Sequence, residues 1–426
     1  DIAGIMGAFG AALIARERHE AGYQTTMLSI EQINKLSYTT KLARCQGCTN
    51  HCLLTINKFS DNRQYITGNR CERGLGGNKQ KKDIPNLFDY KYHRMFDYEP
   101  LTADLAPRGT VGIPRVLNMY ENYPFWATFF RDLGFRVILS PFSTRAIYEL
   151  GMESIPSESE CYPAKLAHGH AQWLIDHGVK TIFHPCVFYE HQEVPGAQNH
   201  FNCPIVVSYP ENIKNNVEAV TDGSVRYLHP FLAFTNEKVA SDRLVQFCKK
   251  VWSIPEKETR HAAHLAWEEQ RRAKADVCAA GAKALADMEK NGGSGIVLAG
   301  RPYHVDPEIN HGINDLITSF GFVLVTEDAL SYLEGYAPRK VLNQWTFQSR
   351  MYNAARYVCT QPDMQVVQLV SFGCGTDAIT TDEMRSILED GDKLYTQLKI
   401  DDISNLGAVK IRIRSLMAAI DARKEN

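Results

Sequence analysis

The chain has 426 residues, which predicts two or three domains because a single hydrophobic core rarely grows beyond about 250 residues. Its 47 Lys and Arg nearly balance its 49 Asp and Glu, and the net charge of -2 provides no field that would attract nucleic acid or an anionic membrane surface. No stretch approaches the roughly 18 consecutive apolar residues of a membrane span, and acid rather than base precedes the first apolar residues, so we expect a cytoplasmic protein that binds neither nucleic acid nor membrane.

The first predicted elements are one or two helices over residues 1–35. Their segment GAFGAALIA offers a small-residue surface for close helix packing. This abrupt apolar start resembles the C-terminal helix of an ATPase domain of the acetate kinase and Hsp70 superfamily, whose nucleotide-binding body would lie upstream. We therefore expect the helical tail of an upstream ATPase domain, and a chain that is a fragment of a longer polypeptide.

A cysteine-rich metal module is predicted over residues 40–80. Eleven cysteines is an odd number in a chain without an export signal, so reduced thiols are expected rather than a disulfide framework. Cys45, Cys48 and Cys52 follow a CxxCxxxC pattern, and Cys71 completes a set of four. Four thiolates on a turn-rich segment can hold one zinc ion or one [4Fe-4S] cluster, and the spacing leaves both open.

Residues Lys81 to Arg108 are polar and aromatic, which is typical of a linker. Over residues 109–240 short apolar runs then alternate with helical stretches. The predicted strands are VGIPRVL, RVILS, KTIFHP and PIVVSYP, and the predicted helices pass through FWATFFRDLG and AKLAHGHAQWLIDHG. Strands separated by helices predict parallel βαβ units, so this region is expected to be a first α/β domain.

A helical bridge is predicted over residues 241–293, because roughly Glu256 to Lys290 is rich in Ala, Glu, Lys and Arg. A second α/β set follows over residues 294–426, with strands GIVLAG, FVLVTED and MQVVQLVSFG, helices from Ile313 and over Val341 to Tyr357, and a C-terminal helix. The predicted fold class is therefore α/β, with two flavodoxin-like open parallel-sheet domains.

Three cysteines are predicted where ligands gather in such folds. Cys161 precedes a helix, Cys186 follows the strand KTIFHP, and Cys374 follows the strand VVQLVSFG. In open α/β sheets ligands bind beyond the carboxyl ends of the strands, so thiols from both domains are expected to converge on one interdomain cleft. Three thiolates around a cubane would leave one iron open to substrate. Cys203 begins the predicted strand PIVVSYP and is either a further ligand or a buried core cysteine.

A polar loop follows the strand GIVLAG in the motif GRPYHVDPEINHGI. It carries Arg301, Tyr303, His304, Asp306 and His311, a density of donors, acids and imidazoles that is typical of a site that binds anions and moves protons. We interpret these five as candidate catalytic residues. In the structural alternative, Asp306 caps the next helix and one histidine satisfies buried backbone groups.

The chain resembles the CoA enzyme activase large proteins (DUF2229 type), relatives of 2-hydroxyacyl-CoA dehydratases and double-cubane cluster proteins, in the motifs CQGCTNHC, GNRCE, SESECYPAKLAHGH, GRPYHVDPEINHGI, SFGCGTDA and YTQLKIDDISNLGAVKIRIRSL. The resemblance covers nearly the whole chain. In that family an ATP-hydrolysing activator with its own [4Fe-4S] cluster delivers an electron to a partner carrying [4Fe-4S] or double-cubane [8Fe-9S] clusters. The resemblance implies that this chain is the acceptor, with ligation by Cys161, Cys186 and Cys374 and with Cys203 as an additional candidate.

Two features depart from the dehydratase pattern: the module at residues 40–80 and the ATPase-type tail before it. They place acyl-CoA dehydration in doubt and leave the substrate open. A double cubane needs more thiolates than the strand ends supply, so some cysteines of the module would serve it instead of a separate centre.

We therefore predict the iron-sulfur, electron-accepting component of an oxygen-sensitive, ATP-dependent reductase that reduces a small substrate in the interdomain cleft. One alternative is a 2-hydroxyacyl-CoA dehydratase component that takes a CoA-ester substrate. Another is a non-catalytic scaffold with zinc or an iron-sulfur cluster at the N-terminal cysteines. The expected partner is an ATP-hydrolysing activator, as a domain or a separate protein, and the family suggests a homodimer.

Overall fold

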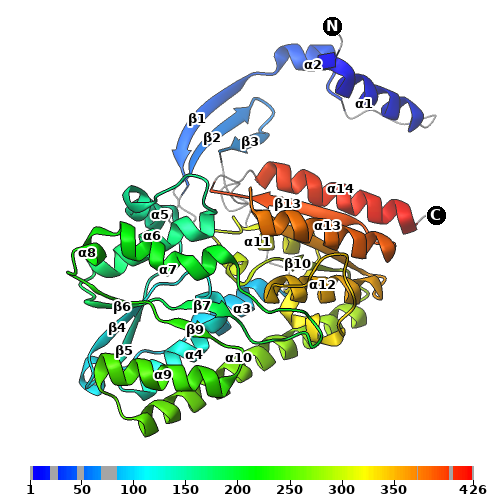
Figure 1. The fold of residues 1–426 in the computed structure, drawn as a ribbon. Coiled ribbons are helices and arrows are strands. Elements are labelled where there is room, and N and C mark those ends of the chain that lie inside the picture. Colours follow the sequence, from blue (N-terminus) through cyan, green and yellow to red (C-terminus); the bar gives the residue numbers. More distant parts are fainter. Residues whose placement is uncertain are drawn as a thin grey trace. The chain divides into compact units, whose positions relative to one another are not determined.

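The computed structural model describes residues 3–19, 27–45, 52–68, 84–371, 373–402 and 406–424. The chain divides into two compact units, and Figure 1 labels many of their helices and strands. The smaller unit consists of Asp1–Arg44 and Leu53–Gly68, and the larger one of Cys45–Cys52 and Asn69–Asn426. All of the predicted strand-end cysteines therefore belong to the larger unit.

The smaller unit contains helices and a three-stranded antiparallel sheet. The strand order is β1-β2-β3, and the register pairs Tyr38 with Phe59. Ser29 and Gln32 exchange side-chain to backbone hydrogen bonds, a capping box that starts α2. Helices are thus present within residues 1–35, as expected. The elements are η1 (Ala3–Ile5), α1 (Met6–Glu17), α2 (Ile30–Lys35), β1 (Tyr38–Arg44), β2 (Leu53–Phe59) and β3 (Gln64–Thr67).

The first parallel sheet of the larger unit has the strand order β5-β4-β6-β8. When its strands are numbered along the chain, this order is 2-1-3-4. The second strand thus lies on one side of the first strand, and the third and fourth strands lie on the other side. A separate parallel pair is formed by β7 and β9. This half contains β4 (Thr110–Ile113), α4 (Met119–Asp132), β5 (Arg136–Leu139), α5 (Arg145–Gly151), η4 (Met152–Ser154), α6 (Tyr162–Asp176), β6 (Thr181–Phe183), β7 (Cys186–Tyr189), α7 (Pro204–Asn216), α8 (Glu218–Thr221), β8 (Arg226–Leu228), β9 (Phe231–Ala233) and α9 (Glu237–Trp252).

The second parallel sheet has the order β11-β10-β12-β13, again 2-1-3-4. Its central strands are buried on both faces, as at Val297, Leu298, Val366 and Val367, which explains their continuous apolar runs. The prediction of an α/β fold with parallel sheets is confirmed. This half contains β10 (Gly295–Ala299), η5 (Pro302–Val305), α11 (Ile313–Ser319), β11 (Val323–Val325), η6 (Glu327–Ala329), η7 (Ser331–Leu333), α12 (Thr346–Cys359), β12 (Met364–Ser371), α13 (Gly375–Asp390), β13 (Tyr395–Ile400) and α14 (Leu406–Lys424).

We predicted a linker at Lys81 to Arg108. This prediction is wrong for the central part of the segment, where helix α3 (Leu87–Phe96) packs into the core. Phe88, Tyr92 and Phe96 are all buried and recur every four residues. That spacing places them on one face of a helix, a pattern that the polar composition of the segment obscured. The segment is therefore part of the folded core.

The run PIVVSYP, expected to be a strand, is instead the start of helix α7. Tyr209 and Ile213 are buried four residues apart on one helical face. Pro204 occupies the first turn, where its missing N–H leaves no hydrogen bond unmade. Local β-branching favoured a strand, and burial of a helical face overrides that preference. Cys203 therefore precedes a helix and not a strand.

The long helix expected between the two sheets is α10 (Glu256–Lys290). It packs against α3, α4 and α9 and also against β11 of the second sheet. We expected the helix of the second set to begin near Val341. This helix, α12, begins at Thr346 instead. One continuous helix thus contacts elements of both halves of the larger unit.

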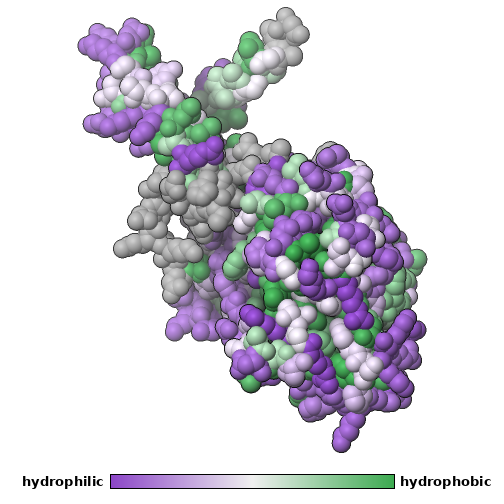
Figure 2. Space-filling model, turned by 90° about the vertical axis from the view of Figure 1, so that its left-hand side faces the viewer, coloured by the Kyte–Doolittle hydropathy of each residue, from purple (hydrophilic) through white to green (hydrophobic). Residues whose placement is uncertain are grey.

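Among the described residues, no helix combines the length and the apolar character needed to cross a bilayer. Figure 2 shows hydrophilic residues over much of the visible surface, with hydrophobic residues between them. Exposed apolar side chains of the smaller unit include Phe9, Ile14 and Leu42. Scattered apolar residues of this kind are ordinary on protein surfaces.

Candidate functional site

Two predicted site segments follow neighbouring strands of the second sheet. Arg301 comes just after β10, and Cys374 comes just after β12. These strands are parallel neighbours, and the connections from them run to opposite sides of the sheet. Open α/β sheets bind ligands beyond the carboxyl ends of strands at such a switch point. The two segments therefore lie where a ligand site is expected.

Three candidate cysteines stand at the starts of helices. Cys161 is the N-cap of α6, Cys203 the N-cap of α7, and Cys374 the N-cap of α13. Free N–H groups and the dipole at a helix N-terminus favour negative charge, so each position suits an anionic ligand group. α6 and α7 belong to the first α/β half and α13 to the second. The thiols thus come from both halves of the larger unit.

Cys203, Cys374 and Arg301 lie close enough to Cys161 to contribute to its pKa. Burial raises the pKa of Cys161 to about 12, with smaller contributions in the same direction from Cys203 and Cys374 and an opposite one from Arg301. Both other cysteines also act on the pKa of Arg301. We refer to Cys161, Cys203 and Cys374 as the thiol cluster.

The Arg301 guanidinium is anchored on the start of α13. Its Nη2 donates to Sγ of Cys374 at 3.4 Å and to Oγ1 of Thr376 at 2.6 Å, and lies 2.8 Å from Oδ1 of Asp377. Burial alone would lower the pKa of Arg301, but Tyr303, Asp377 and the thiols outweigh it and raise the pKa well above its ordinary value. Arg301 is therefore a permanent buried cation beside the thiol cluster.

Tyr303 and His304 are buried and neutral near pH 7. Burial raises the pKa of Tyr303 well above its ordinary value and lowers the pKa of His304 to about 3. Nδ1 of His304 accepts a hydrogen bond from the backbone N–H of Arg301 at 2.9 Å, so the ring proton is on Nε2. Within the described part of the chain, that buried N–H makes no hydrogen bond. The Nε2–H group of His304 is therefore suited to donate a hydrogen bond to a bound group, because the described residues offer it no acceptor.

Asp306 and His311, the other two candidate residues of the polar loop, contact groups of the surrounding fold. Asp306 is fully buried and accepts hydrogen bonds from the backbone N–H of Glu308 at 2.8 Å and from the Tyr120 hydroxyl. Nε2 of His311 lies 2.6 Å from the backbone carbonyl oxygen of Asp401. His311 thus contacts a backbone group, as in the structural alternative, whereas Asp306 caps a turn and not the next helix, whose N-cap is Gly312.

Cys186 has neighbours of its own. It begins β7 and is fully buried. Burial raises the pKa of its thiol to about 12, with an added contribution from Glu211. Its sulfur lies within 4.8 Å of ligand atoms of Glu211 and His229. Cys203 contributes to the pKa of Cys161, and the cluster ligation expected of Cys186 stays a prediction.

The N-terminal four-cysteine set is described in part. The backbone N–H of Cys45 donates to the carbonyl oxygen of Cys52 at 2.9 Å, which closes the ends of the CxxCxxxC segment. Cys48 and Cys71 lie outside the described residues. Metal ligation by this set stays a prediction.

The sequence reasoning missed Thr376 and Asp377, both in the first turn of α13. Besides pairing with Arg301, Asp377 accepts a hydrogen bond from the backbone N–H of Ser371 at 2.8 Å. The available signal was the segment CGTD, which places a hydroxyl and a carboxylate directly after Cys374 at a helix start. Such residues share the free helix N-terminus with the thiol.

These features define a mixed α/β protein with parallel sheets and a group of thiols at helix N-termini. Residues 110–330 match the model of the family described as CoA enzyme activase uncharacterised domain (DUF2229). Because this match spans about half of the chain, the chain belongs to that family. None of the curated proteins matches the chain. The matched region contains Cys161, Cys203 and Arg301, and Cys374 lies beyond it.

Proposed function

We propose that this chain is the iron-sulfur, electron-accepting component of an ATP-dependent low-potential reductase system, in which Cys161, Cys203 and Cys374 hold a [4Fe-4S] cluster. The observation that carries the proposal is the placement of three thiols, each at the start of a different helix, with Cys203 and Cys374 close enough to contribute to the pKa of Cys161 and with Sγ of Cys374 3.4 Å from Nη2 of Arg301. Grouped thiolates are the ligands that iron-sulfur clusters use.

The surroundings fit such a group. A thiolate-bound cluster is an anion, and three helix N-termini and the Arg301 guanidinium offset its charge. Nε of Arg301 and Nε2 of His304 are buried and make no hydrogen bond within the described residues. Cluster sulfurs accept such bonds, whereas three unliganded thiols would leave both donors unsatisfied at a cost of about 1–3 kcal/mol each.

When bound, the cluster would supply one-electron transfer, and with only three thiolates one iron would be open to a small substrate. The side chains of this chain would bind and orient that group. Arg301, Tyr303 and His304 are all buried and so would keep water away from it. Arg301 holds a fixed positive charge there, and His304 holds a neutral donor.

The proposal extends to the architecture and the partner. The two 2-1-3-4 sheets would be flavodoxin-like domains, and the thiol cluster would lie where they meet. An ATP-hydrolysing activator with its own [4Fe-4S] cluster would deliver the electron, and the family description supports a link to such a system. A homodimer, and a double cubane that recruits cysteines of the N-terminal module, belong to the same proposal.

A 2-hydroxyacyl-CoA dehydratase component is the second candidate, favoured by the family description. This function requires selective binding of a CoA ester, which a reductase for another small substrate does not need. Calorimetric titration of the oxygen-free chain with a panel of 2-hydroxyacyl-CoA esters separates the two. Selective binding of one ester supports the dehydratase, and no binding across the panel counts against it.

The test of the main proposal is the metal content of protein purified without oxygen. Iron, sulfide and zinc are measured together with the electron paramagnetic resonance spectrum after reduction. The variants Cys161→Ala, Cys203→Ala and Cys374→Ala are compared with Cys248→Ala, which removes a fully buried core cysteine. We expect iron and the reduced-state signal to be lost in the first three variants and retained in the control.

Two outcomes would contradict the proposal. Unchanged iron content and spectrum in all three variants would show that the thiol cluster holds no iron. Zinc without iron, even after cluster reconstitution, would favour the non-catalytic scaffold.

A further inference from the structure

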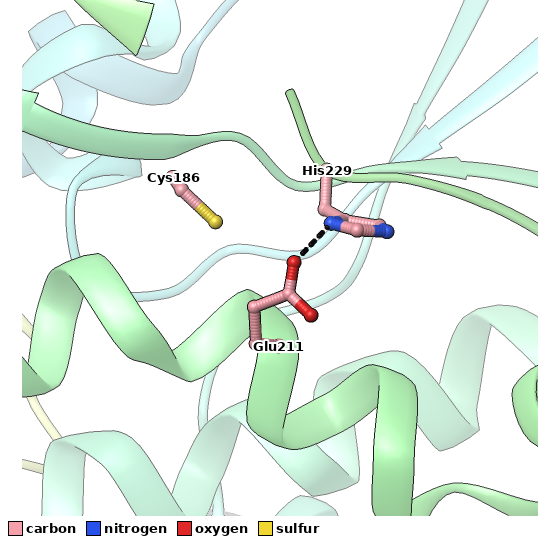
Figure 3. Close-up of side chains that lie close together, drawn as sticks. All are labelled: Cys186, Glu211 and His229. Carbon is pink, nitrogen blue, oxygen red and sulfur yellow. Dashed lines mark ion pairs between the residues drawn. The ribbon is translucent and has the colours of Figure 1, made fainter. Parts of the chain in front are cut away.

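A second group of metal-ligating side chains consists of Cys186, Glu211 and His229. Their ligand atoms all lie within 4.8 Å of one another. Nδ1 of His229 and Oε1 of Glu211 are 2.8 Å apart. Figure 3 shows the sulfur of Cys186 and the ring of His229 on either side of the Glu211 carboxylate. Sulfur, nitrogen and oxygen donors thus face one small volume.

Three elements supply these side chains. Cys186 begins β7, Glu211 belongs to α7, and His229 directly follows β8. The backbone N–H of Cys186 donates to the carbonyl oxygen of Pro230 at 2.9 Å, which holds the cysteine beside the residue that follows His229. α7 packs against β7. Backbone pairing and helix packing therefore set the arrangement, independently of any attraction between the side chains.

We propose that Cys186, Glu211 and His229 bind one zinc ion. Thiolate, imidazole and carboxylate are the protein ligands of zinc, at about 2.3 Å for sulfur and about 2.0–2.2 Å for nitrogen and oxygen. Bonds of that length at tetrahedral angles place a nitrogen and an oxygen roughly 3.3 Å apart, close to the separation of His229 and Glu211. The sulfur would have to approach by about 1 Å, which a rotation of the Cys186 side chain can provide.

His229 and Glu211 form an ion pair without a well-aligned hydrogen bond. Nδ1 of His229 is buried and, within the described residues, makes no hydrogen bond of acceptable geometry, although a carboxylate oxygen lies 2.8 Å away. The ring nitrogen and the carboxylate oxygen are therefore both near the position where a metal ion would be bound. Lys214 pairs with Oε2 of Glu211 at 3.3 Å, which leaves Oε1 for the metal.

The exposure of the three side chains indicates the kind of site. Cys186 is fully buried, whereas the side chains of Glu211 and His229 are 34% and 22% exposed. The thiol would therefore form the inner side of the site, and solvent reaches the outer side. Three protein ligands leave a fourth zinc position, which water would fill.

The proposed zinc site and the thiol cluster share helix α7. Cys203 caps its start, and Glu211 lies about 12 Å further along it, at 1.5 Å per residue. A zinc ion at Glu211 would tie α7 to β7 and β8 and so steady the helix that presents Cys203. The two sets of ligands have no residue in common, so the zinc site does not depend on the proposed function.

The test uses the full chain, purified without oxygen, stripped of metal by a chelator and reloaded with zinc. Bound zinc per chain is compared between the wild type and the variants Cys186→Ser, Glu211→Gln and His229→Gln, with Cys248→Ser as a matched control for a fully buried cysteine. We expect each of the three variants to lose one zinc per chain and the control to keep it. Zinc should also raise the melting temperature of the wild type and the control more than that of the three variants.

Cobalt(II) in place of zinc gives a second readout, because its sulfur-to-metal absorption reports a thiolate ligand. This band should weaken in Cys186→Ser and not in Cys248→Ser. The partly exposed Glu211→Gln and His229→Gln variants keep the test decisive if Cys186→Ser fails to fold. Equal zinc in the wild type and all three variants overturns the proposal, as does iron found in place of zinc. In protein analysed before the chelator treatment, loss of zinc with unchanged iron in the three variants would show that this site is separate from the thiol cluster.

Discussion

Nη2 of Arg301 lies 3.4 Å from Sγ of Cys374, so the loop after β10 contacts the N-terminus of α13 at the thiol cluster. The same guanidinium bonds Thr376 and pairs with Asp377, and it is only 3% exposed. A buried cation of this kind is tolerated because each neighbour compensates its charge. The contact makes the stability of the fold and the integrity of the thiol cluster depend on one side chain.

Arg301→Gln is therefore expected to destabilise the metal-free chain by about 3–5 kcal/mol, because it leaves the buried carboxylate of Asp377 without its partner. Urea unfolding measures the loss. The double variant Arg301→Gln/Asp377→Asn should recover part of it, since no unpaired charge remains. A loss below about 1 kcal/mol in the single variant, the range of exposed pairs, would show that the ion pair is not buried in solution.

Gly169→Ala tests the contact between α5 and α6, the helix that begins after Cys161. A Cβ at position 169 would lie 1.7 Å from the carbonyl oxygen of Ile147. The two helices would have to separate, so we expect a loss of about 3 kcal/mol in thermal or urea unfolding and a lower iron content. Gly335→Ala is the control, because its Cβ would meet nothing within 4 Å; it should change stability by less than about 0.5 kcal/mol.

Arg350 connects α12 to two acidic residues across the core. It is 1% exposed and donates to Glu193 at 2.5 Å and to Glu121 at 3.0 Å. Arg350→Gln would leave the largely buried Glu121 without this partner and Glu193 with Lys274 alone, and we expect a loss of about 3 kcal/mol in guanidinium unfolding. Arg260→Gln, which removes an exposed pair with Asp242, should cost less than about 1 kcal/mol. Similar losses in both variants would contradict the difference in burial.

Glu190 predicts a pH dependence of stability. Its carboxylate accepts hydrogen bonds from Asn122 and Asn202, each at 3.1 Å, and from Asn118. Burial nevertheless raises its pKa to about 8, with a further contribution from Glu121. The folded chain thus keeps a proton on Glu190 that the unfolded chain has already lost at neutral pH.

Because this pKa is raised on folding, the stabilising contribution of Glu190 is complete below its unfolded pKa of 4.5 and is lost as the pH rises to about 8. Between pH 5 and pH 7 the loss from this group alone is about 1 kcal/mol per pH unit. Glu190→Gln should flatten the dependence by that amount in urea unfolding across this range. The exposed Glu237→Gln variant should keep the wild-type slope; equal slopes in all three proteins would contradict the raised pKa of Glu190.

Local patterns account for the parts of the fold and site that were predictable. Continuous apolar runs marked β10 and β12, and an Ala-, Glu- and Lys-rich stretch marked α10. Strand ends then placed Arg301 and Cys374 at one edge of a sheet, because parallel strands present their carboxyl ends together. The polar composition around α3 misled the prediction, since its buried aromatic face is visible only at helical spacing.

By itself, the sequence determined the helices and strands that follow from composition and from the spacing of apolar residues. It also determined which kinds of ligand chemistry its cysteines offer. Only the tertiary structure decided which cysteines meet. PIVVSYP folds as a helix because burial of one face outweighs β-branching, and this places Cys203 at a helix start beside Cys161. Cys186 lies instead against Glu211 and His229, because β7 pairing and α7 packing bring together residues that are distant in the sequence.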